Sequence, residues 1–332
     1  MQGYRVGICG ATGLVGRQLL QVLEERRFPV ADLVALASRR SAGSKVRFQD
    51  TDIEVREARP GAFQGCDLVF FAAGTDVSRE LAPVAVQEGA VVIDKSNAFR
   101  MDPEVPLVVP EINGETLRQH KGIIASPNCS TTQLVMALHP LRRAANLERV
   151  LVSTYQAVTG TGADALDELE SQVANGAAPR VYPRPIAFNV LPHCDSFGDG
   201  DYTGEEWKLV RETRRILGLP DLKISATAVR VPVRVGHSES VWVQLDRVVD
   251  LAEVRRLLAE APGVQVMDDP GGGQYPTPLD AAGNDDVWVG RIRRDPADDR
   301  ALWMWIVSDN LRKGAATNAV QIAEQLSAWS LI

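Results

Sequence analysis

The stretch YRVGICGATGLVGRQLLQVLEER, residues 4–26, decides the fold of the first part of the chain. Residues 4–9 are an apolar run typical of a buried strand, and residues 14–26 have the apolar spacing of a helix. Between and around these two, glycine recurs at every third position: Gly7, Gly10, Gly13 and Gly16. Glycine permits a tight turn and the close approach of a pyrophosphate, and the helix N-terminus offers free N–H groups. The pattern predicts a dinucleotide-binding turn, although glycines that serve only tight helix–strand packing would look the same.

Short apolar runs and helical patterns continue to alternate after this turn. We expect strands at residues 33–37, 68–72 and 90–94, with a helix at residues 77–87. Strands that alternate with helices form a parallel sheet with helices on its faces. The first part of the chain is therefore expected to be a Rossmann-type α/β domain.

The pattern changes after about residue 150, where longer alternating runs begin. They predict the strands of a second, mixed sheet, at residues 151–155, 225–231, 240–247, 287–293 and 301–307. Helical patterns lie between them, at residues 163–173, 204–217 and 251–259. We expect an α+β domain here, and a last helix at residues 315–329 that could pack back on the first domain.

Composition narrows the classes of function. The chain has 332 residues, enough for two domains, and a net charge of -7 with a pI near 5.3 argues against nucleic-acid binding. No apolar run is long enough to cross a membrane, and residues 1–6 lack the pattern of a signal peptide. The four cysteines form no C-x-x-C pair, so neither a metal site nor a disulfide framework is indicated. We expect a cytoplasmic protein without metal, nucleic-acid or membrane partners.

The residues after the second expected strand bear on the choice of dinucleotide. The acidic residue that would hold the ribose 2′-hydroxyl of NAD is absent, and ASRRSAG stands at residues 37–43 instead. Two arginines and two hydroxyls suit a 2′-phosphate, so NADP is the expected cofactor. A solvated basic turn is the alternative.

A candidate nucleophile lies in ASPNCSTTQ, residues 125–133, just before a helical apolar run. A cysteine at a helix N-terminus has its thiolate stabilised by free amides and by the helix dipole, which suits Cys129 for nucleophilic attack. The same amides and the Asn128 side chain could hold an oxyanion. Alternatively, Cys129 is a small buried residue beside helix-capping hydroxyls. The other cysteines are interpreted as structural: Cys9, Cys66 and Cys194.

A thiol nucleophile needs an acid or base, and the chain has four histidines. His237 stands at a glycine turn between two expected strands, where a side chain can face a cleft. It is the best candidate because imidazole titrates near neutral pH. The remaining three have less suitable positions: His120, His139 and His193.

With these motifs in place, the chain resembles the bacterial aspartate-semialdehyde dehydrogenase family over essentially its whole length. The motifs that carry the resemblance are GATGLVG at 10–16, SRRSAG at 38–43, SNAFRMD at 96–102, PNCSTTQ at 127–133, STYQAVTGTG at 153–162, EEWK at 205–208, RVPVRVGHSES at 230–240 and SDNLRKGAA at 308–316. The resemblance implies reversible, phosphate-dependent oxidation of aspartate 4-semialdehyde with NADP, in lysine, threonine and methionine synthesis. It also implies a homodimer, with an NADP-binding domain at 1–127, a catalytic and dimerisation domain at 128–312, and a C-terminal helix at 313–332 that packs on the first domain.

The resemblance also implies a role for each matching residue. Cys129 would attack 4-aspartyl phosphate, expel phosphate and form an acyl-thioester, which hydride from NADPH reduces on the way to the aldehyde. His237 would act as acid and base, and Gln156 would orient the acyl group. The implied substrate-binding residues are Arg230 for the carboxylate, Glu205 for the amino group, and Arg100 and Lys208 for phosphate. The implied cofactor-binding residues are Gly10, Thr12, Gly13, Leu14, Val15, Ser38, Arg40, Ser41, Thr159, Gly160 and Asn310.

One residue departs from the family pattern. Lys95 stands where an uncharged residue, commonly asparagine, is expected, and it adds a positive charge near Arg100.

Two other classes of protein share parts of the pattern: a related phosphorylating dehydrogenase, such as N-acetylglutamyl-phosphate reductase or a glyceraldehyde-phosphate dehydrogenase, and a non-catalytic NADP-binding protein on the same fold. An acetylated amine would have no use for Glu205, and a binding protein would need neither Cys129 nor His237.

Overall fold

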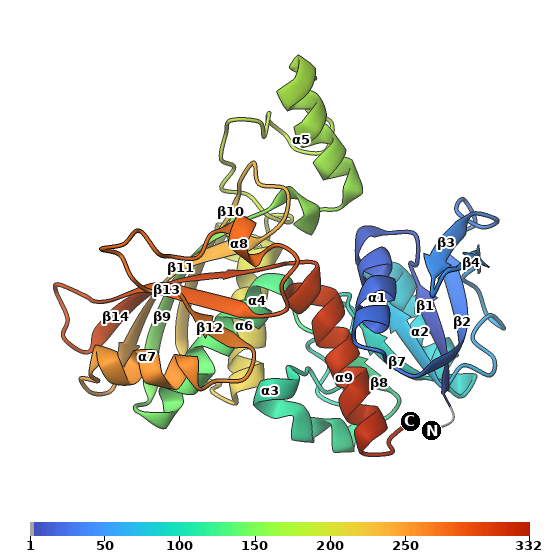
Figure 1. Cartoon of the computed structure of the whole chain (residues 1–332), viewed down its shortest axis with the longest axis horizontal. Coiled ribbons are helices and arrows are strands. Elements are labelled where there is room, and N and C mark those ends of the chain that lie inside the picture. The colour runs from blue at the N-terminus through green and yellow to red at the C-terminus, as the bar shows by residue number, and fades with distance from the viewer. Residues whose placement is uncertain (1–2) are drawn as a thin grey trace. The chain divides into compact units, whose positions relative to one another are not determined.

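The computed structural model describes residues 3–332, which divide into two compact units (Figure 1). The first unit runs through Asn128 and also includes Ala315–Ile332, and the second unit is Cys129–Gly314. Within the described residues, no helix combines the length and apolar character that crossing a bilayer requires.

The first unit contains a six-stranded, all-parallel sheet. Its strands, in spatial order, are β5 (Arg56–Glu57), β2 (Val30–Ala37), β1 (Tyr4–Cys9), β6 (Leu68–Phe71), β7 (Val91–Asp94) and β8 (Ile123–Ala125). Its helices are α1 (Leu14–Glu25), α2 (Thr75–Gln87), the short α3 (Pro110–Asn113) and α9 (Thr317–Ala328). The parallel pairing confirms the expected Rossmann-type class.

Two apolar cores lie on opposite faces of this sheet, because successive strand residues point to opposite sides. Val6 and Ile8 of β1 pack in one core with α1 and α9, and Cys9 packs in the other core with α2. Polar contacts also tie α9 to this unit: the Tyr4 hydroxyl and the Ser327 hydroxyl lie 2.9 Å apart.

The sequence-based prediction did not include a small hairpin of β3 (Lys45–Phe48) and β4 (Thr51–Glu54), which pair as antiparallel strands. Its tight turn is made by Gln49 and Asp50, with positive φ angles of 45° and 61°. Hairpin turns of this kind usually carry glycine, which is the signal that sequence reasoning looks for. The three-residue β8 was missed because it is too short to show a period.

The second unit contains a mixed six-stranded sheet. Its spatial order is β10 (Lys223–Arg230), β9 (Leu147–Gln156), β11 (His237–Leu245), β14 (Ala301–Ser308), β13 (Val287–Arg294) and β12 (Val264–Val266). The pairs β9–β10 and β12–β13 are parallel and the others are antiparallel, which confirms the expected mixed sheet. The main helices are α4 (Cys129–Leu138), α5 (Ala163–Asn175), α6 (Gly204–Leu217) and α7 (Leu251–Ala259), and the short α8 (Pro278–Ala281) lies in a loop.

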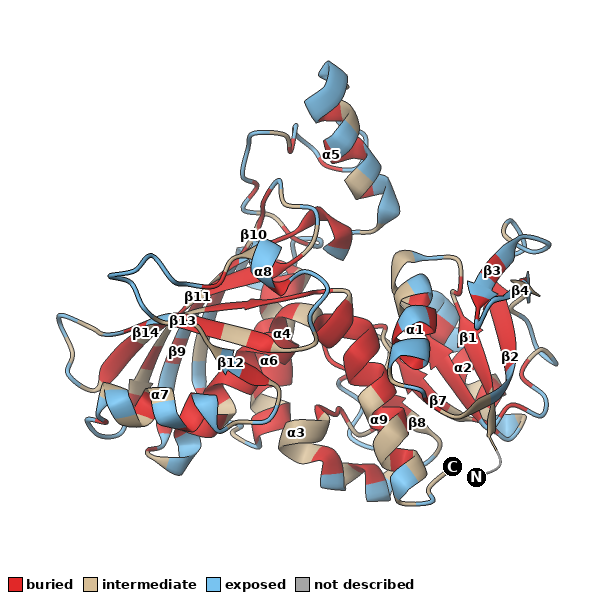
Figure 2. Ribbon diagram, in the orientation of Figure 1, coloured by how far each residue is buried: buried red, intermediate tan, exposed pale blue. Residues whose placement is uncertain are grey.

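Buried and more exposed residues alternate along strands of this sheet, and Figure 2 colours each residue by its burial. Residues such as Val150, Val152 and Val241 are buried, on the face that α4, α6 and α7 contact. Residues of opposite phase are more exposed, although many are large and apolar. They include Leu151, Tyr155, Trp242, Trp303 and Trp305.

Candidate active site

The glycine turn of the first unit has the shape of a phosphate cradle. Gly10 has a φ of 93°, and a side chain there would lie 2.5 Å from the carbonyl oxygen of Ala72. A side chain at Gly16 would overlap the Gly10 carbonyl. Helix α1 begins just after the exposed Gly13, without a side-chain cap and with no acidic residue in its first turn. Free N–H groups at an uncovered helix start are what a pyrophosphate requires, so the residues fit a dinucleotide.

The neighbouring residues Thr12, Leu14 and Val15 are all partly exposed around this helix start. Gly7 has a different task, since a side chain there would lie 3.1 Å from Val69 across the sheet. Gly7 therefore allows close packing between β1 and the neighbouring strand β6.

The basic turn after β2 is open to solvent. Ser38, Arg39 and Arg40 are exposed, and the backbone N–H of Ser41 donates to the Ser38 carbonyl at 2.9 Å. Within residues 3–332, neither arginine side chain has a hydrogen bond or an ion pair. Two guanidinium groups are therefore presented on one tight turn.

Cys129 is the first residue of α4 and is partly exposed, whereas the other three cysteines are buried. Burial raises the pKa of Cys9 and of Cys194 to about 12 in each case, and also raises that of Cys66. The three buried thiols are thus poor nucleophiles. Gly314 of the π-helical turn Arg312–Ala316 packs against Cys129: a side chain on Gly314 would lie 2.9 Å from the Cys129 Cβ.

Strand register brings four buried polar residues into one row at an end of the second sheet. Arg230 of β10 pairs with Gln156 of β9, and His237 of β11 pairs with Ser308 of β14. The pairing of Tyr155 with Ser238 makes Gln156 and His237 the next residues of their two strands. The Ser308 hydroxyl donates to the side-chain oxygen of Gln133 at 2.6 Å, which ties this row to the helix that begins at Cys129.

His237 is fully buried and is held in a defined orientation. The backbone N–H of Ala157 donates to Nδ1 at 3.0 Å, so the neutral ring carries its proton on Nε2. Burial, helped by the charge of Arg230, lowers the pKa of His237 to about 3, although Glu205 and the Gly236 carbonyl favour the charged form. Within residues 3–332, Nε2 has no hydrogen-bond partner. A buried, unpartnered donor indicates a group that a ligand satisfies.

Arg230 presents a second such donor. It is 5% exposed, its Nη1 donates to the Ala157 carbonyl at 2.7 Å, and its Nε has no partner in the described part of the chain. Gly160 lies between the two groups: a side chain there would be 2.9 Å from Arg230 Nη1 and 3.0 Å from His237 Nε2. The absence of a side chain at Gly160 therefore leaves room beside both nitrogen atoms.

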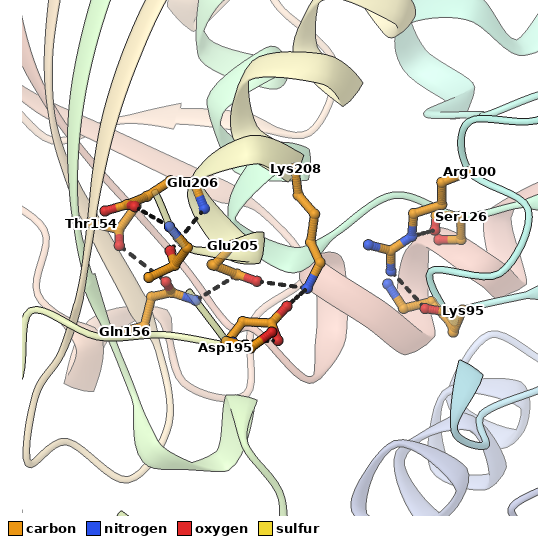
Figure 3. A network of polar contacts seen from close by, with 11 residues as sticks. Lys95, Arg100, Ser126, Thr154, Gln156, Asp195, Glu205, Glu206 and Lys208 are labelled. Atoms are coloured by element: carbon orange, nitrogen blue, oxygen red, sulfur yellow. Dashed lines mark hydrogen bonds and ion pairs between the residues drawn. The ribbon is translucent and has the colours of Figure 1, made fainter. Parts of the chain in front are cut away.

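A carboxylate lies at the centre of a further polar network (Figure 3). Glu205, 6% exposed, accepts from Gln156 Nε2 at 2.9 Å and from Lys208 Nζ at 3.1 Å. Lys208 also donates to Asp195 at 2.7 Å. Burial raises the pKa of Asp195, but the hydrogen bond and charge of Lys208 outweigh this and the pKa falls below its usual range. Gln156 and Glu205, which lie far apart in sequence, are thus in direct contact.

Thr159 and Asn310 brace the turn that leads to His237. Asn310 accepts from the Gly236 N–H at 2.9 Å and donates to the Thr159 hydroxyl at 3.1 Å, and that hydroxyl donates to the Arg234 carbonyl at 2.7 Å. Gly236 has a φ of 97°, so the turn needs a glycine. Thr159 and Asn310 therefore both make hydrogen bonds within the second unit that stabilise this turn.

Arg100 and Asn128 lie in the first unit and are both buried. Arg100 donates from Nε to the Ser126 carbonyl at 3.0 Å and from Nη2 to the Lys95 carbonyl at 2.7 Å. Ser126 follows β8 directly and precedes Pro127 and Asn128. Arg100 is thus attached to the segment that leads into Cys129.

Sequence reasoning overlooked Glu239, which is fully buried two residues after His237 on the same face of β11. Burial raises the pKa of Glu239 well above its usual value, Gln133 lowers it, and the charge of Glu205 raises it further. Sequence reasoning also overlooked Asp195, which contacts Lys208, and Gly314, which packs against Cys129. The two-residue period of β11 was the available signal for Glu239, because a strand that buries His237 buries residue 239 as well.

Comparison with known proteins defines the class. Residues 5–120 match the family described as semialdehyde dehydrogenase, NAD binding domain, and residues 138–313 match semialdehyde dehydrogenase, dimerisation domain. The chain therefore belongs to the semialdehyde dehydrogenase family, and the dinucleotide-binding first part and the expected enzyme class are confirmed.

Within that family, the relatives are aspartate-semialdehyde dehydrogenases. The Bacillus subtilis enzyme is 48% identical over 344 residues, covering 100% of this chain and 99% of the relative. Aspartate semialdehyde dehydrogenase II of Vibrio cholerae, solved in complex with ASA, has a TM-score of 0.95 at 42% identity and covers 99% of both chains. The Candida albicans enzyme, solved with NADP, has a TM-score of 0.79 at 29% identity, covering 99% of this chain and 100% of its own.

Proposed function

We propose that this protein catalyses the reversible, phosphate-dependent oxidation of aspartate 4-semialdehyde to 4-aspartyl phosphate, with NADP as hydride acceptor. The observation that carries the proposal is a pair of buried donors, Arg230 Nε and His237 Nε2, which have no partner within residues 3–332. Gly160 leaves space beside His237 Nε2 and beside Nη1 of the same arginine. A carboxylate-bearing substrate would satisfy the first donor, and an oxyanion would satisfy the second.

Cys129 is the proposed nucleophile. In the biosynthetic direction its thiolate attacks the acyl carbon of 4-aspartyl phosphate, the C–O bond to phosphate breaks, and an acyl-thioester forms. The dinucleotide supplies the hydride that reduces this thioester. The resulting thiohemiacetal collapses to the aldehyde and returns the thiolate, and in the other direction the same steps run in reverse. His237 carries its proton on Nε2, from which the neutral ring would donate a hydrogen bond to the thiohemiacetal oxygen.

The buried charges match the charges of the proposed substrate. Arg230 would clamp the α-carboxylate, and Glu205 would accept from the α-ammonium group. Gln156, held by Glu205, would orient the acyl group. Lys208 and Arg100 are proposed for phosphate, and the amide of Asn128 is proposed to assist the oxyanion.

The cofactor is proposed to be NADP rather than NAD. The glycine turn at Gly10, Thr12, Gly13, Leu14 and Val15 would hold the pyrophosphate. Arg40, with Ser38 and Ser41, lies on an open basic turn that suits a 2′-phosphate. Thr159, Gly160 and Asn310 would meet the nicotinamide part.

The assembly is proposed to be a homodimer joined through the second unit. The dimerisation-domain match covers this unit, and one face of its sheet leaves Leu151, Tyr155 and three tryptophans partly uncovered. Aromatic residues on a flat face are typical of the core of an interface.

The test is NADPH formation, followed by absorbance, from aspartate 4-semialdehyde with and without phosphate. Wild type should be active only with phosphate, Cys129→Ala should be inactive, and Cys66→Ala should remain active because Cys66 lies in the core of the first unit. Parallel assays with N-acetylglutamate 5-semialdehyde and glyceraldehyde 3-phosphate cover the related dehydrogenases. Inactive wild type that still binds NADPH, or turnover of one of those substrates instead, would overturn the proposal.

A further inference from the structure

Lys95 follows strand β7, and its side chain contacts the segment that follows the neighbouring strand β8. Strands β7 and β8 are parallel, and Asp94 pairs with Ala125, so both strands end at the same edge of the sheet. Lys95 directly follows β7, and its Nζ donates to the carbonyl oxygen of Pro127 at 2.7 Å. Pro127 lies two residues before Cys129.

Arg100 holds the preceding carbonyl in the same way. Its Nε donates to the Ser126 carbonyl, and its Nη2 donates to the carbonyl of Lys95 itself (Figure 3). The backbone N–H of Ser126 donates to the Asp94 carbonyl at 2.8 Å. Two consecutive carbonyls ahead of Cys129 are therefore each bound by a cationic side chain, and the two cations are linked through the Lys95 backbone.

Other hydrogen bonds also hold the residues around Lys95 and Ser126, so the backbone that Lys95 contacts is already restrained. Asn318 of α9 donates to the Ser126 hydroxyl at 3.0 Å. The Asp94 carboxylate accepts from the Ser96 N–H at 3.0 Å and from its hydroxyl at 2.7 Å. Lys95 supplies the contact that extends this anchoring one residue further, to the Pro127–Asn128 peptide.

We propose that Lys95 is a positioning residue for the nucleophile, which fixes the Pro127–Asn128 peptide and thereby the direction in which Cys129 enters α4. The inference rests on the proposed role of Cys129. A charge-assisted hydrogen bond is stronger than the bond that a neutral amide could make, and it polarises the peptide whose N–H belongs to Asn128. The Lys95 ammonium therefore holds the Pro127–Asn128 peptide, which lies in the first unit directly ahead of the nucleophile.

The proposal is tested with Lys95→Met, which keeps most of the apolar stem and removes the ammonium group. Lys95→Arg restores a cationic donor, and Lys121→Met is the matched control because Lys121 is an exposed lysine paired with Glu104. For each variant, kcat, the KM for phosphate and the rate of Cys129 alkylation by iodoacetamide across pH 6–10 are measured. Dinucleotide affinity and thermal unfolding report on folding.

We expect Lys95→Met to lower kcat and the rate of Cys129 alkylation by roughly tenfold, with the KM for phosphate unchanged. Lys95→Arg should recover most of both rates, and Lys121→Met should match wild type. A rise in the KM for phosphate with kcat and alkylation unchanged would overturn the proposal in favour of a phosphate-binding lysine. Unchanged values throughout would overturn it as well. Alkylation needs no substrate, so it tests Lys95 even if the dehydrogenase activity proves wrong.

Discussion

Gly160 lies so close to His237 that a methyl group on Gly160 would be 3.0 Å from Nε2 of the histidine ring. The same methyl would lie 2.9 Å from Nη1 of Arg230. Both neighbours are buried and are held by Ala157, so neither can move away without losing a hydrogen bond. The glycine therefore keeps a space beside the unpartnered Nε2 of His237 and beside Nη1 of Arg230.

Gly160→Ala should lower activity strongly without unfolding the protein. We expect kcat/KM for aspartate 4-semialdehyde to fall by roughly a hundredfold, since displacing two buried hydrogen-bonding groups costs about 3 kcal/mol. The control is Gly271→Ala in an exposed loop, where the nearest atom would be 3.5 Å away. Steady-state kinetics and a thermal melt of both variants give the result. An alanine variant with wild-type kinetics would show that the space is not used.

Glu205→Gln should weaken binding of aspartate 4-semialdehyde more than binding of phosphate. The variant keeps the shape of the side chain but loses the charge that would meet an ammonium group. We expect the KM for aspartate 4-semialdehyde to rise roughly tenfold or more, the value of a charged hydrogen bond. Glu170→Gln, at an exposed ion pair with Arg234, serves as control. Equal effects of the two variants would contradict the assignment.

The exposed basic turn should set the preference for dinucleotide. Replacing Arg39 and Arg40 together by alanine should raise the KM for NADP by roughly tenfold to a hundredfold, because a charge-assisted pair with the 2′-phosphate is lost. The KM for NAD should stay as it is. Arg47→Ala, on the exposed hairpin, controls for general loss of positive charge. If the KM values for both dinucleotides rise together, the turn does not read the 2′-phosphate.

His237 should make the folded protein sensitive to acid. Its pKa is about 3 in the folded state and near 6.5 when unfolded, so the unfolded chain binds more protons between these values. Its contribution to stability is therefore complete above pH 6.5 and is lost as the pH falls toward 3. Between pH 7 and pH 4.5 the loss amounts to roughly 2–3 kcal/mol. Urea unfolding of wild type and His237→Gln at both pH values should show a shallower loss in the variant, and parallel losses would refute this.

The partly uncovered sheet face should hold the dimer together. Leu151, on β9, is 39% exposed on this face, and Leu151→Arg would place a charge into the proposed interface. Sedimentation velocity should show a dimer for wild type and a concentration-dependent shift to monomer for the variant. Val77→Arg, at an equally exposed position on α2, should remain dimeric. A variant at Leu151 that sediments like wild type would exclude this face.

The parts that sequence predicted best are those with a local cause. The strand–glycine turn–helix at residues 4–26 depends on neighbours in the chain, and the structure has β1 and α1 there. The hairpin β3–β4 was missed because Gln49 and Asp50 adopt a turn that local rules assign to glycine. The contact of Gln156 with Glu205 depends on packing between β9 and α6, and no local pattern encodes such a contact. The same is true of Gly314 against Cys129, which joins two distant segments.

The first unit is built from both ends of the chain, with Ala315–Ile332 completing it. Six buried residues of this last segment complete the core that β1 and α1 begin: Ala316, Ala319, Val320, Ile322, Ala323 and Leu326. During synthesis, a ribosome releases β1 and α1 long before it releases their partner α9. The dinucleotide-binding half must therefore wait, with one face of its sheet incompletely covered, until the second half has been made. A stop codon ahead of Ala315 would leave the second unit whole and would strip the first unit of part of its core.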